Sequence, residues 1–387
     1  MITMVRPPAV QNATATRECA TITAMAALKG TFRILMLYDI SEEIRLEEVR
    51  KLIRAEPAAR EPAFTRPAPE YVRFERPPVI EPLEPSTLET GKTVRRRLKY
   101  FEYGVVSVDL AFDFDTDWPG LVSLSSHWVS SPQVESRTAD LVRKHAGAMA
   151  GALVKPYPEW ASEDYYIIEL HQASDADGGP IEAKAMLASH GAEIAQIVRG
   201  ESQPLAESER LEVLQSSLSY YPCDLLVAGW VAALVYDTPA GAAPLIQLLE
   251  YANAQLIEFR HYDQLLTRIL GEVYRYLERE TRFWRRWKLA REAERLNTIR
   301  LDVMELTERS DNALKFLSDM FYARAYRLAA DKVGATDYRR LVDAKLRTAG
   351  ELYGFMVDEF HQSRAFVLEF MVVAILIIEL VYLFRGK

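Results

Sequence analysis

Cysteine is scarce in this sequence, with only Cys19 and Cys223 among 387 residues. Two distant cysteines cannot build a disulfide framework or a cysteine-rich metal site, so we expect a reducing compartment around the folded part. Positive charge is also in deficit. The net charge of −8 excludes a protein that binds nucleic acid through its overall charge, although it leaves room for a local basic patch.

Residues 1–29 lack a secretory signal, because their longest apolar run, Ala24–Leu28, is too short for the core of a signal peptide. The segment is rich in threonine and alanine and poor in acids. We expect a disordered tail, and the alternative that the composition leaves open is an organellar transit peptide.

The recurrent motifs of enzymes are missing as well. No phosphate-binding GxxxxGK[ST] loop, dinucleotide-binding GxGxxG, zinc-binding HExxH, paired CxxC or nucleophile GxSxG is present. The six histidines are scattered, with no pair at ligand spacing: His127, His145, His171, His190, His261 and His361. We therefore predict no catalytic residue, no cofactor and no metal, and we favour a protein that is not an enzyme.

Segments typical of strands and helices alternate irregularly over residues 30–239. Apolar and β-branched runs predict strands at Thr31–Asp39, Asp164–Gln172, Leu211–Tyr220 and Asp224–Asp237, and one long strand or a hairpin at Arg95–Asp115 with Gly104 marking a bulge. Amphipathic patterns predict helices at Ser41–Arg54, Gln133–Val154 and Ile181–Arg199. These elements predict an α+β protein whose head domain is mixed α/β. Eight of the nineteen prolines mark an insertion at about 56–90, expected to be loop with an edge strand at Tyr71–Arg76.

The pattern changes to a helical one over residues 240–364. Apolar residues recur in steps of three and four from Leu245 to Leu277, a second helical stretch covers Arg291–Lys332, and a third apolar series runs from Val342 to Phe360. We predict a long antiparallel helical stalk that resembles a coiled coil.

The first stalk helix carries a polar cluster, Arg260, His261 and Asp263. The spacing places Asp263 inward, one turn beyond Phe259, where a carboxylate is costly unless a cation faces it from Arg260 or a neighbouring helix. We interpret the cluster as a polar seam, an ion pair that fixes the register of the helices. The alternative is a metal or acid–base site at His261 and Asp263.

Basic and aromatic residues alternate shortly after this cluster. They are Arg282, Trp284, Arg285, Arg286, Trp287 and Lys288. Cations beside aromatic rings suit phosphate headgroups or RNA, through charge and stacking. An alternative of equal weight is a solvated helix face whose tryptophans pack inward. A shorter basic run, Arg95–Lys99, is expected only to make a strand end soluble.

The segment 365–384 has the length that a helix needs to cross a hydrocarbon core, and a short basic tail, residues 385–387, follows it. Glu369 and Glu379 lie inside the segment, where their carboxylates would make polar contacts that hold an oligomer together. We predict one transmembrane helix here, and the alternative is a helix buried in a soluble core.

Three stretches resemble the "required for meiotic nuclear division" family. At the C-terminal end, a Leu-Glu pair (Leu368 and Glu369) opens an apolar helix and Glu379 follows about ten residues on. The segments Phe32–Ile53 and Phe101–Val108 are similar to the family's first strand and helix and to its aromatic-Gly-Val strand. The resemblance implies an oligomeric inner-membrane protein with its head in the cytoplasm or the mitochondrial matrix. Eukaryotic members support mitochondrial translation, and the family pattern carries no catalytic residue.

Together these features favour a membrane-anchored, self-associating scaffold or tether in the inner membrane, which holds translation-related or envelope-related partners nearby. The expected partners are the membrane, further copies of the chain and an unidentified protein, with RNA or the ribosome as a weaker prediction through the basic and aromatic patch. The alternative is a membrane-attached enzyme of unknown reaction with a polar site near His261 and Asp263.

Overall fold

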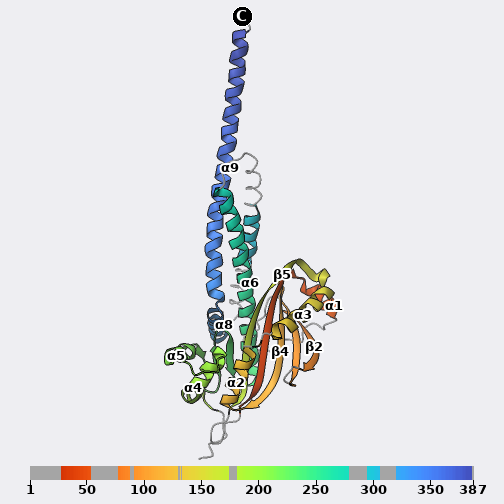
Figure 1. Cartoon of the computed structure of the whole chain (residues 1–387), viewed down its shortest axis with the longest axis vertical. Helices are drawn as coiled ribbons and strands as arrows, with labels where there is room; N and C mark the ends of the chain where they lie inside the picture. The colour runs from red at the N-terminus through yellow and green to blue at the C-terminus, as the bar shows by residue number, and fades with distance from the viewer. Residues whose placement is uncertain are drawn as a thin grey trace, which may run out of the picture.

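The computed structural model describes residues 28–53, 77–87, 91–129, 131, 133–173, 181–278, 294–305 and 320–385. An eight-stranded sheet lies at one end of the molecule, and a rod of helices rises from it towards the C-terminal end (Figure 1). The protein is therefore mixed α/β. Most of the predicted tail at 1–29 and the expected edge strand at Tyr71–Arg76 lie outside the described residues.

The sheet has the strand order β2-β3-β4-β1-β5-β8-β7-β6. Its strands are β1 (Leu28–Ile44), β2 (Val79–Thr87), β3 (Thr93–Tyr100), β4 (Val105–Thr116), β5 (Leu153–Ala173), β6 (Ser217–Leu218), β7 (Leu225–Ala228) and β8 (Ala232–Tyr236). Neighbouring strands are antiparallel, except that β5 and β8 are parallel. The long central strands β1, β4 and β5 therefore set the register of the whole sheet.

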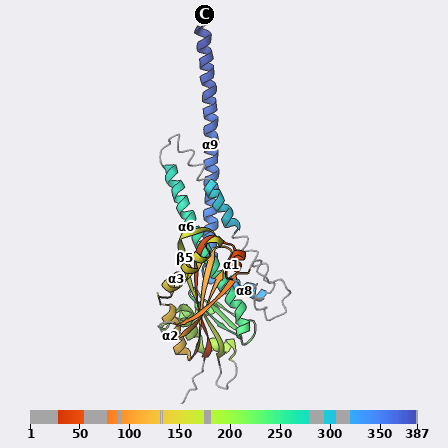
Figure 2. The same cartoon turned by 90° about the vertical axis from the view of Figure 1, so that its right-hand side faces the viewer.

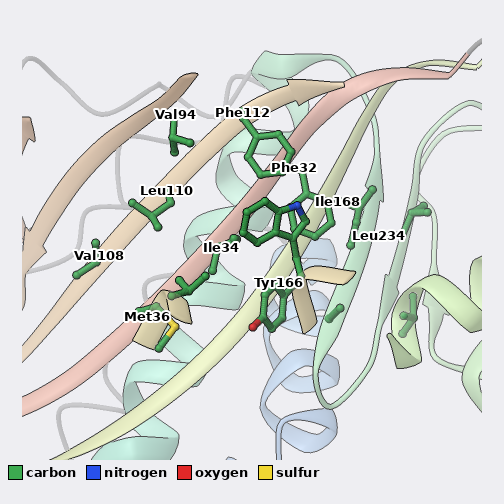
Figure 3. Close-up of a cluster of buried hydrophobic side chains, with 14 of the residues drawn as sticks. Phe32, Ile34, Met36, Val94, Val108, Leu110, Phe112, Tyr166, Ile168 and Leu234 are labelled. Atoms are coloured by element: carbon green, nitrogen blue, oxygen red, sulfur yellow. The ribbon is translucent and has the colours of Figure 1, made fainter. Parts of the chain in front are cut away.

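One face of the sheet packs against five short helices. They are α1 (Leu46–Ile53), α2 (Trp118–Val129), α3 (Gln133–Ala148), α4 (Ala183–Arg199) and α5 (Glu207–Gln215), with a 3-10 turn at Ala150–Ala152. Alternate residues of β1, from Phe32 to Met36, point into this core beside Phe112 and Ile168 of the flanking strands (Figure 3). The rings of Phe32 and Phe112 stack at 5.3 Å, which fixes β1 against β4.

The opposite face packs against two other helices. These are α6 (Pro239–Glu278) and α8 (Met320–Lys332). The odd-numbered Leu35 and Leu37 of β1 lie here with Tyr165 and Ile167 of β5, against Leu249 and its neighbours on α6. Because β1 is apolar on both faces over this stretch, the sequence reads as a continuous apolar run, as expected of a central strand.

Several predicted element boundaries are wrong, each for a local reason. The predicted helix at Ser41–Arg54 begins only at Leu46, because β1 continues to Ile44 in pairing with β5. The predicted strand Leu211–Tyr220 is largely the helix α5, followed by the two-residue β6. The predicted strand Asp224–Asp237 is a hairpin, with β7 and β8 on either side of Gly229.

The segment Arg95–Asp115, predicted as one long strand or a hairpin, forms a hairpin of β3 and β4, and its turn depends on Gly104. This residue has φ +91°, and a Cβ added to it would lie 1.6 Å from the carbonyl oxygen of Ser41. Only glycine tolerates both the backbone angle and the approach. The proline-rich insertion also contains regular structure, because β2 pairs with β3 at the edge of the sheet, where proline is tolerated.

The rod consists of α6, a helical segment at 294–305 and α9 (Ala335–Arg385). Both α6 and α9 lead away from the sheet in the same direction, as two views at right angles show (Figures 1 and 2). The antiparallel, coiled-coil-like stalk is wrong as predicted, because the first half of its first helix packs on the sheet and not on other stalk helices. The apolar residues of α6 serve two purposes. Those in its first half cover the sheet, whereas Phe259, Tyr262, Leu266, Ile269 and Leu270 pack against the other rod helices.

The C-terminal part of the rod corrects a second prediction. None of the helices in the described ranges combines the length and the apolarity needed to span a membrane. Glu369 and Glu379 interrupt the apolar run on which the prediction of a transmembrane helix at 365–384 was based. The predicted anchor is wrong. The expected location in an inner membrane stays a prediction.

Candidate functional site

The sheet face that α6 covers changes from apolar to charged along each central strand. On β1, Leu35 and Leu37 lie under α6, whereas Lys29 and Arg33 lie on the same face nearer the start of the strand. The strands β3, β4 and β5 continue this charged area. We call the following residues the polar face: Lys29, Thr31, Arg33, Arg95, Arg97, Lys99, Asp109, Asp113, Glu169 and His171.

A buried ion triad lies at the centre of the polar face. Arg33 donates to both oxygens of Asp109 on β4, at 2.8 and 2.6 Å, and to Glu169 on β5, at 2.8 and 2.6 Å. All three side chains are buried. Burial would lower the pKa of the Arg33 guanidinium, but the two carboxylates outweigh burial and raise it above its ordinary value. The guanidinium therefore stays charged inside the sheet.

The neighbouring strand β3 extends the network towards the sheet edge. Arg97 donates to Oδ2 of Asp109 through Nε at 3.2 Å and through Nη2 at 2.5 Å. Burial would raise the pKa of Asp109, but the charges of Arg33, Arg97 and Lys99 hold it at about 2. Asp109 thus serves as the common acceptor for two arginines on different strands.

Helix α6 closes one side of the polar face through a buried carboxylate. Glu250 accepts from the Ser107 hydroxyl of β4 at 2.6 Å and forms an ion pair with Lys99 of β3. Both members of this pair are buried. The prediction that Arg95–Lys99 only makes a strand end soluble is therefore wrong for Lys99, which links the sheet to the rod.

A more exposed group lies on the other side of the triad. Arg95 binds Asp113 through two parallel hydrogen bonds of 2.8 Å, and the Thr31 hydroxyl donates to the same carboxylate at 2.9 Å. The hydrogen bond from Arg95 is the main reason that the pKa of Asp113 is lowered to about 2. His171 lies 3.4 Å from the Thr31 hydroxyl. This group is fixed by geometry yet open to water.

A cavity of about 1160 Å³ lies over the polar face. Its floor includes Lys29, Arg33, Arg95 and Arg97, and one wall is formed by the first turns of α6, from Pro239 to Gln247. The edge strand β2 contributes an apolar rim with Val79, Ile80 and Pro82. Gly30 also lines the cavity, and a Cβ at this position would lie 1.9 Å from the carbonyl oxygen of Glu169. The cavity therefore combines a charged floor with apolar sides.

Within the described part of the chain, no group of three or more His, Cys, Asp or Glu residues is placed to hold a metal ion. The polar face contains charged donors and acceptors that are paired with one another. Its chemistry is suited to holding a charged molecule by hydrogen bonds and ion pairs.

The comparison with protein families identifies the chain through its sheet domain. Residues 29–243 match the family described as "Uncharacterized protein MJ0711, N-terminal domain". The chain belongs to this family. The uncharacterized protein MJ0711 of Methanocaldococcus jannaschii is 19% identical over 219 residues, which are 57% of this chain and 65% of that protein. The chain thus covers less than two thirds of its relative, and no solved structure matches it.

The MJ0711 N-terminal domain family is one of unknown function, and the link to the meiotic nuclear division family stays a prediction. The match begins at Lys29 on the polar face and ends within the first turns of α6. It therefore covers the sheet and almost the whole cavity, whereas the rod lies beyond it.

The three residues of the predicted polar seam do not form one site. Arg260 pairs with Glu163 of β5, and Asp263 pairs with Lys345 of α9. His261 lies with Nδ1 at 2.9 Å from Oδ2 of the buried Asp39. Residues 261 and 263 are about 200° apart around a helix, so their side chains contact different elements. The geometry gives no support to an acid–base or metal site shared by His261 and Asp263.

Most of the other predicted site residues lie outside the described part of the chain. The basic and aromatic patch, from Arg282 to Lys288, lies outside the described residues, and so does the side chain of Glu369. Glu379 is exposed on α9. Because no described helix can span a membrane, the structure gives no support to a polar contact of Glu379 inside one.

Sequence reasoning missed the polar face. Arg33, Asp109 and Glu169 each stand inside a strand that is otherwise apolar, and this was the available signal. A charged residue in a central strand needs a partner on the next strand. Arg33 is in register with Ala111 of β4 and with Ile167 of β5, which lie two residues along each strand from Asp109 and Glu169. This register could not be read from the sequence.

Proposed function

We propose that the protein is a self-associating scaffold without catalytic activity, whose copies assemble through the C-terminal part of α9 and present their sheet domains at one end. The supporting observation is an exposed apolar helix. Twelve large apolar side chains between Met371 and Phe384 are at least half exposed. A soluble chain rarely leaves so large a continuous apolar surface uncovered.

The occupant that we propose for this surface is further copies of the same helix. Half-exposure of twelve large side chains leaves an apolar area on the order of 1,000 Å², similar to the ~800 Å² that each partner buries in a standard interface. The apolar side chains point to all sides of the helix, so one partner would cover only part of them. We therefore expect at least three copies in a parallel bundle.

A pair of substitutions tests this proposal. Leu376→Asp with Leu383→Asp places two carboxylates in the apolar surface, and we expect it to convert the assembly to a monomer of 44.1 kDa. Size-exclusion chromatography with light scattering gives the mass. The matched control is Leu52→Asp with Leu211→Asp, which changes two exposed leucines of the sheet domain and should leave the mass of the assembly unaltered.

The proposal fails if the unaltered chain is monomeric or if the control dissociates the assembly as readily as the α9 variant. A monomeric chain that binds lipid vesicles through the same residues would contradict it equally. Both results are read from the same mass measurement, with and without vesicles.

A further inference from the structure

The buried part of the polar face contains charged side chains that a stable sheet does not require. Arg33, Asp109 and Glu169 occupy neighbouring central strands, where apolar residues of similar volume would be as stable or more so. Their charges are nevertheless fully paired at 2.6–2.8 Å. Such a rigid network lies directly beneath a cavity and gives the groups above it a fixed position.

The network presents cations to the cavity and keeps the central carboxylate below. The side chain of Asp109 is 1% exposed, whereas that of its partner Arg97 is 43% exposed. Arg97 binds Asp109 through Nε and Nη2, and Nη1 donates to no acceptor within the described residues. Lys29 and Arg95 are also more than half exposed. A molecule that enters the cavity therefore meets guanidinium and ammonium groups, together with the carboxylate of Asp113, which lines the cavity beside Arg95 and is also exposed.

The walls of the cavity define the rest of the ligand. Ile80 and Pro82 of β2 and Ile246 of α6 supply apolar surface. The N-terminal end of the 40-residue helix α6 also borders the cavity, and the positive end of a helix dipole favours an anion. The volume exceeds the roughly 300–1,000 Å³ of ordinary small-molecule sites. There is room for a charged group and an organic body.

We infer that this cavity is a binding site for a small organic anion, whose phosphate or carboxylate groups are held by Arg97, Arg95 and Lys29. Asp109 and Asp113 do not use Nη1 of Arg97 and Nε of Arg95, and both kinds of oxyanion accept charge-assisted hydrogen bonds from such guanidinium donors. The buried acceptor Asp109 holds the fork of Arg97 in place. The apolar part of the anion lies against Ile80, Pro82 and Ile246.

Isothermal titration of the full chain with two probes, inorganic pyrophosphate and citrate, tests the inference. We expect at least one of them to bind, and we expect Arg97→Gln to weaken that binding by about tenfold or more, because one charge-assisted contact is lost. Whichever probe binds more tightly assigns the phosphate or the carboxylate class. The matched control is Arg96→Gln. Arg96 directly precedes Arg97 on β3, donates to the backbone of Glu84 and does not line the cavity.

Lys29→Gln is a second test that does not touch the buried network, because the ion pair of Lys29 with Asp115 is exposed. It should also weaken binding while thermal unfolding stays unaltered. The inference is overturned if neither probe binds at millimolar concentration. It is also overturned if Arg96→Gln weakens binding as much as Arg97→Gln, or if both cavity variants bind as the unaltered chain does.

Discussion

At the scale of single residues, Asp109 joins the two strands that flank β4 in the polar face. Its carboxylate accepts hydrogen bonds from Arg33 of β1 and Arg97 of β3, and it is shielded from water. A carboxylate shared by two guanidiniums offsets the repulsion between them. Removing its charge would leave both cations next to each other without their common partner.

Asp109→Asn should therefore reduce the free energy of unfolding by about 3–5 kcal/mol, the cost of breaking a buried ion pair. Denaturant unfolding followed by circular dichroism measures the change. The control is Asp115→Asn on the same strand, whose exposed pair with Lys29 should contribute less than about 1 kcal/mol. Equal effects of the two substitutions would show that the triad is not a stabilising unit.

The acid side of the stability profile follows from the same carboxylates. The pKa values of Asp109 and Asp113 are about 2 in the folded chain, below the ordinary value of 3.8. Between these pH values the unfolded chain binds more protons than the folded chain. The contribution of the two carboxylates to the free energy of unfolding is therefore fully present above about pH 4 and is lost as the pH falls towards 2. Acid unfolding of Asp109→Asn should lose part of this dependence. A profile identical to that of the unaltered chain would contradict the lowered pKa.

Part of the polar face can be seen in the sequence, and part cannot. The alternation of Arg95, Arg97 and Lys99 along one strand predicts a charged face. Arg33 and Glu169, by contrast, are isolated charges within apolar stretches of β1 and β5, and only the pairing of these two strands brings them together. Contacts between strands 76 or 136 residues apart depend on register, which local patterns do not specify.

At the scale of elements, α6 shows what an apolar series can and cannot predict. Steps of three and four correctly identify a helix with one buried side, but they do not say whether a helix or a sheet covers that side. Leu249 packs towards the sheet, whereas Leu266 packs towards the rod helices. The misread α5 has the opposite cause, because its short segment carries too few apolar residues to show a period.

The pair formed by Asp263 and Lys345 joins α6 to α9. Lys345 also donates to the Thr267 hydroxyl one turn further along α6. A double-mutant cycle with Asp263→Asn and Lys345→Gln should give a coupling energy of about 1 kcal/mol in unfolding experiments. The control cycle uses Asp337 and Arg340, an exposed pair within α9, and its coupling should be near zero. Zero coupling for the first pair would remove it as a determinant of helix alignment.

At the scale of the whole molecule, the chain has a sheet domain that a family shares and a rod beyond the family match. The cavity belongs almost entirely to the shared part. The apolar helix surface at Met371–Phe384 belongs to the other part. This division separates the two proposals, since ligand binding depends on the sheet and assembly on α9. Variants of one should leave the other unaltered.

Sedimentation equilibrium of the unaltered chain over a wide concentration range tests self-association most directly. Each copy has a mass of 44.1 kDa. We expect the average mass to rise with concentration to at least three times that value, because a single partner helix cannot cover an apolar surface that faces all sides. A mass that stays at that of one copy throughout the range would contradict the proposal.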